Sequence, residues 1–142
     1  MMSKDSELDI VASTTAAKKF KILLVDDSPF VRTQVRDVVL TQQATVLEAE
    51  DGIQALAVGE KHPDINLILC DINMPKMDGL AFLKILSERS TPGKPRIPVI
   101  MLTTENMLDK VVQGKKLGAV AWVIKPMSAP DIIRLIEKFK PA

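Results

Sequence analysis

Five polar side chains stand directly after short apolar runs of this chain, and their types suit phosphoryl-transfer chemistry. They are Asp26, Asp27, Asp71, Thr103 and Lys125. Three carboxylates held at one place repel one another, and a divalent cation relieves that repulsion. Mg²⁺ prefers oxygen ligands, commonly one or two carboxylates together with water and a phosphate. A hydroxyl and a lysine suit phosphoryl oxygens, so the set indicates phosphoryl transfer, a chemistry in which aspartyl phosphate is a known covalent intermediate.

Each of these residues also has an ordinary structural interpretation. Asp26 and Asp27 could be turn residues or helix caps, and Asp71 could cap a turn. Thr103 could cap a helix, and Lys125 could be a solvated surface lysine. The functional interpretation therefore depends on whether the surrounding elements bring all five side chains together.

Those elements alternate between strands and helices. Continuous apolar runs rich in β-branched residues are typical of strands buried on both faces, as in parallel sheets. Strands are expected at residues 22–25, 45–47, 65–70, 99–102 and 120–124. Helices are expected after the N-caps Ser28 and Asp51, around Leu80–Leu86, over residues 105–117 and over residues 129–139.

Five strands alternating with five helices predict a three-layer α/β sandwich around a parallel sheet. In open sheets of this kind, ligands bind outside the carboxyl ends of the strands. Four of the five expected strands end at one of the polar groups. Side chains that are 45, 32 and 22 residues apart in the sequence should therefore converge at one edge of the sheet.

Composition narrows the remaining classes of function. The 142 residues are 46% apolar and 26% charged with a net charge of +1, which predicts a soluble globular domain without a basic nucleic-acid surface. A single cysteine excludes an intramolecular disulfide and favours the cytoplasm. The single histidine, His62, argues against a His-based metal cluster and is interpreted as a polar residue near a helix end. The first 19 residues have no long apolar run, so neither a signal peptide nor a membrane helix is expected.

Four stretches of the sequence resemble the response-regulator receiver family, the CheY-like domains. They are Ile22–Ser28 (ILLVDDS), Leu67–Leu80 (LILCDINMPKMDGL), Val99–Thr104 (VIMLTT) and Gly118–Pro126 (GAVAWVIKP). The resemblance implies a flavodoxin-like (βα)5 fold with sheet order 2-1-3-4-5. We therefore expect a receiver domain over residues 20–142, a flexible extension over residues 1–19, and no attached output domain.

The resemblance implies a role for each matching residue of the phosphoryl site. Asp71 would accept a phosphoryl group from a phosphohistidine of a partner kinase. Asp26 and Asp27 would hold Mg²⁺ together with an Asp71 oxygen and the backbone carbonyl of Asn73. Lys125 would contact the phosphoryl group.

The resemblance also implies how the site would communicate. The Thr103 hydroxyl would move toward the phosphoryl group, and Trp122 would reorient in the position where most receivers have Tyr or Phe. Asn73 and Glu105 would tune the lifetime of the phosphoryl group. The Lys125–Pro126 peptide bond would be cis.

These roles imply a signalling switch rather than an enzyme, since the protein would catalyse only its own phosphorylation and dephosphorylation. Output would pass through protein contacts on the face made by the fourth expected helix (residues 105–117), the fifth strand (residues 120–124) and the fifth helix (residues 129–139). The stretches DDSPFVR and GAVAWVIKPM resemble the chemotaxis or surface-motility branch. The implied partners are a CheA-type histidine kinase, a flagellar or pilus motor component and a phosphatase.

Three other functions compete with this interpretation. A phosphate sink or relay intermediate would take phosphoryl groups without a motor partner. A haloacid-dehalogenase-like phosphohydrolase also uses a strand-end aspartate, but it requires a second acid two residues later, where this chain has Asn73. A nucleotide-binding module is disfavoured because neither GxGxxG nor GxxxxGK[ST] occurs.

Overall fold

The computed structural model describes residues 20–93 and 96–140, and of Glu105 and Asn106 it describes the backbone alone. The expected extension over residues 1–19 lies outside the described residues. The strands are β1 (Phe20–Val25), β2 (Ala44–Ala49), β3 (Leu67–Asp71), β4 (Val99–Thr103) and β5 (Ala121–Ile124). The helices are α2 (Pro29–Leu40), α3 (Gly52–Lys61), α4 (Gly79–Glu88), the 3-10 helix η1 (Glu105–Lys110), α5 (Val111–Lys116) and α6 (Ala129–Phe139).

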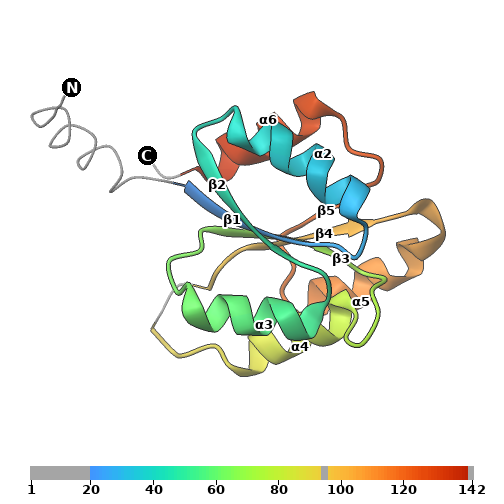
Figure 1. Ribbon diagram of the computed structural model, residues 1–142. Coiled ribbons are helices and arrows are strands. Elements are labelled where there is room, and N and C mark those ends of the chain that lie inside the picture. The colour runs from blue at the N-terminus through green and yellow to red at the C-terminus, as the bar shows by residue number, and fades with distance from the viewer. Residues whose placement is uncertain (1–19, 94–95, 141–142) are drawn as a thin grey trace, which may run out of the picture.

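The five strands form one parallel sheet in the order β2-β1-β3-β4-β5. Helices α2 and α6 cover one face, and α3, α4 and α5 cover the other (Figure 1). The prediction of a three-layer α/β sandwich with order 2-1-3-4-5 is confirmed. Strand boundaries differ from those expected by one or two residues, which is the ordinary uncertainty at element ends.

The sheet is buried on both faces, and its central strands β1, β3 and β4 are apolar at nearly every position. In β1, Leu23 and Val25 point into the apolar layer beneath α3 and α4. Ile22 and Leu24 point into the layer beneath α2 and α6. This double burial explains why the strands have continuous apolar runs rather than an alternating pattern.

The expected N-caps begin their helices. The Ser28 hydroxyl accepts a hydrogen bond from the Val31 amide at 3.3 Å, and Pro29 follows at the first helical position. The Asp51 carboxylate accepts from the Gln54 amide at 2.9 Å at the start of α3. These caps hold the segments that follow β1 and β2 close to the carboxyl edge of the sheet.

The expected continuous helix over residues 105–117 is wrong in detail. The structure has a 3-10 helix over Glu105–Lys110, followed by α5, which ends at Lys116. An i to i+3 hydrogen bond from the Met107 amide to the Thr104 carbonyl, 3.0 Å long, tightens the first turn. Two β-branched valines and Gly114 weaken the helix propensity of the remainder (VVQGKK). The helical segment ends before Gly118, whose positive φ of +102° is typical of the residue that terminates a helix.

Candidate functional site

The parallel register brings the predicted site residues to one edge. Asp26 follows β1, Asp71 ends β3, Thr103 ends β4 and Lys125 follows β5. At this edge Asp71 is paired with Leu102 across β3 and β4. A cavity of about 280 Å³ opens there, and it is lined by Asp27, Asp71, Ile72, Asn73, Thr103, Thr104, Met107 and Lys125.

Three carboxylates meet at this edge. Asp26, Asp27 and Asp71 each offer an oxygen, and these oxygens lie within 4.8 Å of one another. Asp26 is fully buried and Asp71 nearly so, whereas Asp27 is exposed. Clustered carboxylate oxygens with one side open to solvent are a donor set that fits Mg²⁺ or another hard divalent cation.

Lys125 reaches into the same cluster. Its ammonium nitrogen lies 3.1 Å from an oxygen of Asp26 and 3.2 Å from an oxygen of Asp71. The backbone amide of Lys125 donates to the Thr103 carbonyl at 2.7 Å, which fixes the start of the loop after β5. The Lys125–Pro126 peptide bond is cis, as the resemblance implies. A buried carboxylate pair thus shares one cation.

Burial and charge shift the protonation of this cluster. Burial raises the pKa of Asp71 above its ordinary value, and the charge of Asp26 adds to the shift. Lys125 and a backbone hydrogen bond from Asn73 oppose it. Burial disfavours the charged form of Lys125, but the carboxylates of Asp71 and Asp26 outweigh that cost and raise its pKa. The site therefore favours additional positive charge beside Asp71.

Thr103 is buried at the end of β4, and its hydroxyl donates to the Thr104 carbonyl at 3.1 Å. The alternative interpretation of Thr103 as a helix cap is wrong, because the N-cap residue of η1 is Thr104. Asn73 is exposed and lines the cavity. The side chain of Glu105, expected to tune phosphoryl lifetime, lies outside the described part of the chain.

Trp122 lies in β5 opposite Met101 of β4. Its side chain is half-buried and packs on the apolar layer beneath α3, α4 and α5. The indole lies so close to Gly114 that a Cβ atom at Gly114 would overlap its six-membered ring. The indole Nε1 is buried and has no hydrogen-bond partner among the described residues. In this conformation Trp122 is therefore an aromatic residue of β5 that packs against α5 and the apolar layer.

Two residues that the sequence patterns did not single out lie against the backbone of Asp26 and Asp71. Arg32 donates from Nη1 to the backbone carbonyl of Asp26 at 2.6 Å. The amide of Gly79 donates to the Ile72 carbonyl at 2.8 Å, and a Cβ atom at Gly79 would overlap the carbonyl oxygen of Asp71. Gly79 lies within the family-like stretch and could have been found there, whereas no local signal identifies Arg32.

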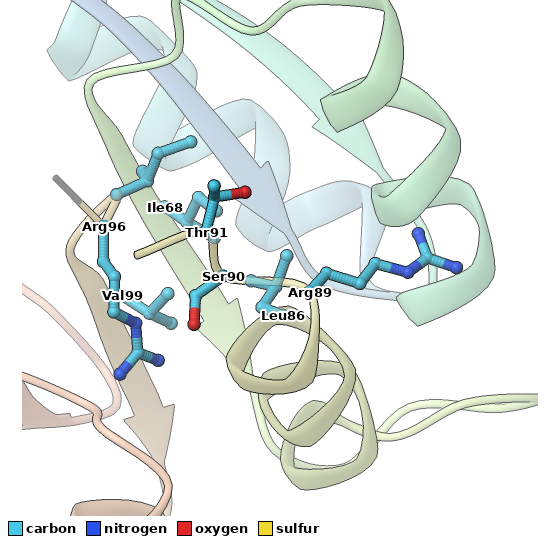
Figure 2. Close-up of a pocket in the computed structure, with 8 residues that line it drawn as sticks. Ile68, Leu86, Arg89, Ser90, Thr91, Arg96 and Val99 are labelled. Carbon is cyan, nitrogen blue, oxygen red and sulfur yellow. The ribbon is translucent and has the colours of Figure 1, made fainter. Parts of the chain in front are cut away.

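A second cavity, of about 230 Å³, lies near the amino ends of β3 and β4, beside the end of α4 (Figure 2). Ile68, Leu86 and Val99 line its apolar part, and Arg89 and Arg96 stand at its sides. None of the predicted site residues lines this cavity. Among the described residues, no helix is long and apolar enough to cross a membrane.

Comparisons with known proteins agree with this geometry. The family described as the response regulator receiver domain matches residues 22–137. The chain is 35% identical to the chemotaxis protein CheY of Listeria monocytogenes over 120 residues, which cover 83% of this chain and 96% of that protein. The solved structure of the chemotaxis response regulator CheY4 of Vibrio cholerae superposes with a TM-score of 0.75 at 33% identity, covering 85% and 98% of the two chains.

Other relatives are longer proteins. The chain is 38% identical to a gliding motility regulatory protein of Myxococcus xanthus, covering 81% of this chain and 14% of that protein. It covers 53% of the nitrate/nitrite response regulator NarL of Escherichia coli, at 34% identity. Receiver domains occur in signalling proteins that take phosphate from histidine kinases and act on downstream partners. The matching family, the CheY relatives and the strand-end acidic cluster together place this chain in the response regulator receiver domain family.

Proposed function

We propose that this protein is a phosphorylation-controlled signalling switch that accepts a phosphoryl group on Asp71 from a phosphohistidine kinase. One observation carries the proposal. The Asp71 carboxylate lines an open cavity and lies within 4.8 Å of two further carboxylates and 3.2 Å from the Lys125 ammonium. We assign the receiver domain to residues 20–142 and treat residues 1–19 as an extension.

The proposed transfer is a nucleophilic substitution at phosphorus. An oxygen of Asp71 forms a bond to phosphorus while the bond between phosphorus and the donor histidine nitrogen breaks. The electron pair of that bond goes to the leaving nitrogen. The other ring nitrogen keeps its proton, so the product is a neutral imidazole. Lys125 stands where it can neutralise charge on the phosphoryl oxygens, and Thr103 supplies a hydroxyl at the same cavity.

We propose that Asp26, Asp27, Asp71 and the backbone carbonyl of Asn73 hold Mg²⁺. The support is the chemistry of the donor set, because three clustered carboxylates suit a hard cation that also accepts phosphoryl oxygens. When bound, the cation would supply positive charge beside the transferred group. Asp26 and Asp27 would then hold the cation beside Asp71, whose carboxylate lines the cavity.

Phosphorylation would bias Thr103 and Trp122 toward a second packing and so alter the surface beside them. Among the described residues, that surface carries exposed apolar side chains on η1, α5 and β5, namely Leu108, Val112 and Ile124. We propose that a protein partner contacts these side chains. The chemotaxis and gliding-motility names of its relatives favour a motor component as that partner, with Asn73 and Glu105 tuning the lifetime of the signal.

Phosphotransfer from acetyl phosphate in the presence of Mg²⁺ tests the acceptor. The intact mass should increase by one phosphoryl group, and the emission of Trp122, the only tryptophan, should change. Asp71→Asn should abolish both responses. Asp109→Asn, which alters an exposed aspartate of η1, is the matched control and should respond like the wild type. Equal phosphorylation of the Asp71 variant would refute the assignment.

Two further measurements separate the alternatives. Capture of partners with the phosphorylated protein should recover a motor component, whereas recovery of kinases alone would favour a phosphate sink or relay intermediate. Turnover of small phosphate esters would instead favour a phosphohydrolase. The Asp71→Asn protein is the control in both experiments.

A further inference from the structure

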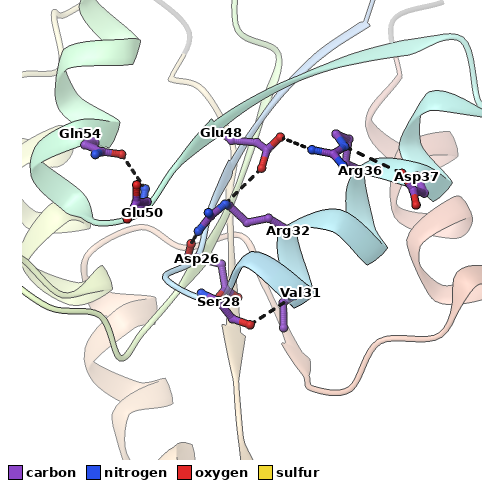
Figure 3. Close-up of polar contacts among 9 residues, drawn as sticks. All are labelled: Asp26, Ser28, Val31, Arg32, Arg36, Asp37, Glu48, Glu50 and Gln54. Atoms are coloured by element: carbon purple, nitrogen blue, oxygen red, sulfur yellow. Dashed lines mark hydrogen bonds and ion pairs between the residues drawn. The ribbon is translucent and has the colours of Figure 1, made fainter.

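The peptide group that joins the two metal-site aspartates is held from outside the site. The Asp26 amide, which belongs to the preceding peptide group, donates to the Ala49 carbonyl of β2 at 3.0 Å. The Asp26 carbonyl accepts from Nη1 of Arg32 at 2.6 Å (Figure 3). Because a peptide group is planar, the Asp26 carbonyl shares its plane with the Asp27 amide. Rotation of this plane would move the two carboxylates relative to each other.

Arg32 is itself held by Glu48 of β2. Nε of Arg32 donates to one oxygen of Glu48 at 3.1 Å, and Nη1 of Arg36 donates to the other oxygen at 3.0 Å (Figure 3). The Arg32 side chain is 14% exposed, so its position is set by packing as well as by charge. Strand β2 thus holds Asp26 at its amide through Ala49 and at its carbonyl through Glu48 and Arg32.

We propose that Arg32 is a positioning residue that fixes the Asp26–Asp27 peptide and thereby sets the affinity of the acidic cluster for a divalent cation. Asp26 is fully buried, so loss of Arg32 would leave its carbonyl without the donor that the structure provides. A buried carbonyl without a partner favours rotation of the peptide toward another donor or toward water. The three carboxylate oxygens would then no longer converge.

Because Arg32 is charged, the direction in which the cation affinity changes on its removal tests the inference. A guanidinium near the acidic cluster repels a divalent cation, so its removal should strengthen cation binding if charge alone matters. Loss of positioning should weaken binding instead. Arg36 is the matched control, because it carries the same charge and contacts Glu48 and Asp37 rather than Asp26 in the described part of the chain.

The inference rests on the proposed Mg²⁺ site and is tested by binding rather than by phosphorylation. Mg²⁺ is titrated into the full chain, and the backbone amide resonances of Ser28 and Asn73 report the dissociation constant. The Ser28 amide is suitable because it donates to a carboxylate oxygen of Asp26 at 2.9 Å. Arg32→Met should weaken Mg²⁺ binding on the order of tenfold, as is typical for residues that orient metal ligands. Arg36→Met should bind as tightly as the wild type or slightly tighter.

Arg32→Lys provides a second variant that keeps the charge. One ammonium group cannot bond both Glu48 and the Asp26 carbonyl in the geometry of the guanidinium, so binding should again weaken. Equal affinity of Arg32→Lys and the wild type, or of Arg32→Met and Arg36→Met, would overturn the inference. A wild-type protein that does not bind Mg²⁺ would instead overturn the metal site of the proposed function, and the inference with it.

Discussion

The ammonium nitrogen of Lys125 lies 3.2 Å from a carboxylate oxygen of Asp71, although 54 residues separate them in the sequence. The same nitrogen lies 3.1 Å from Asp26, which is fully buried. One cation therefore compensates two acids at the carboxyl edge of the sheet. This relationship makes the acidic cluster dependent on a single side chain whenever no divalent cation is bound.

Replacing Lys125 should destabilise the protein. Lys125→Met would leave the buried Asp26 and Asp71 without their cation, and breaking a buried ion pair typically costs about 3 kcal/mol of unfolding free energy. Urea denaturation at neutral pH measures the loss, which should shrink when Mg²⁺ is added because the added cation replaces the missing charge.

The matched control is the exposed pair of Lys21 and Asp64, whose side chains are 25% and 64% exposed. Lys21→Met should cost less than about 1 kcal/mol, with no response to Mg²⁺. Losses of equal size in the two variants would contradict the coupling of Lys125 to a buried cluster.

Asp71→Asn should change how stability depends on pH. Burial, with the charge of Asp26, raises the pKa of Asp71 in the folded protein. The protonated carboxyl of Asp71 therefore stabilises the folded protein. This stabilisation is fully present at pH values below the pKa of Asp71 in the unfolded chain, about 3.9, and is lost as the pH rises through the higher pKa in the folded protein. Without divalent cations, the variant should become more stable relative to the wild type as pH rises through that window. Denaturation at a series of pH values measures the difference.

Asp64→Asn should show the opposite trend. The hydrogen bond from Lys21 lowers the pKa of Asp64 in the folded protein. The ionised carboxylate of Asp64 therefore stabilises the folded protein at pH values above its pKa in the unfolded chain, and this stabilisation is lost as the pH falls through the pKa in the folded protein. This variant should therefore become less stable relative to the wild type as pH rises. A pH-independent difference for Asp71→Asn would show that its carboxyl is not shifted as described.

Gly114→Ala should destabilise the protein even though alanine is the better helix former. The new Cβ atom would overlap the Trp122 indole, and such overpacking typically costs about 1–3 kcal/mol. The emission spectrum of Trp122 should shift because the ring must move. Thermal unfolding and fluorescence measure the two effects.

Gly59→Ala in α3 is the control, because a Cβ atom there would contact nothing within 4 Å. It should stabilise the protein by about 0.5–1 kcal/mol and leave the emission unchanged. Trp122→Phe should reduce the penalty of Gly114→Ala, since phenylalanine is smaller than tryptophan. An equal gain in stability from both alanine variants would rule out a close contact at Gly114.

Gly79→Ala should disturb the site through the backbone. Its Cβ atom would overlap the Asp71 carbonyl oxygen and would also lie 2.9 Å from Cα of Ile72. The end of β3 must then shift, with an expected cost of about 1–3 kcal/mol and weaker Mg²⁺ binding. Amide NMR titration measures the affinity. Unchanged Mg²⁺ binding in a folded variant would show that the edge tolerates this displacement.

Much of the fold could be predicted from local patterns. Buried parallel strands are continuous apolar runs, and caps such as Ser28 and Asp51 mark where helices begin. The exception is the segment after β4, where one continuous helix over residues 105–117 was expected. Its first turns adopt a 3-10 helix, and weak propensity in the following VVQGKK segment limits α5 to six residues.

The sequence by itself determined that acids, a hydroxyl and a lysine follow four of the strands, and parallel strands place their carboxyl ends at one edge of the sheet. Only the tertiary structure decided which atoms meet. Lys125 contacts Asp26 across 99 residues, Arg32 holds the Asp26 carbonyl, and Gly114 accommodates the Trp122 ring. These contacts depend on how separate elements pack and on the side-chain rotamers that the packing permits, and no local sequence pattern encodes either.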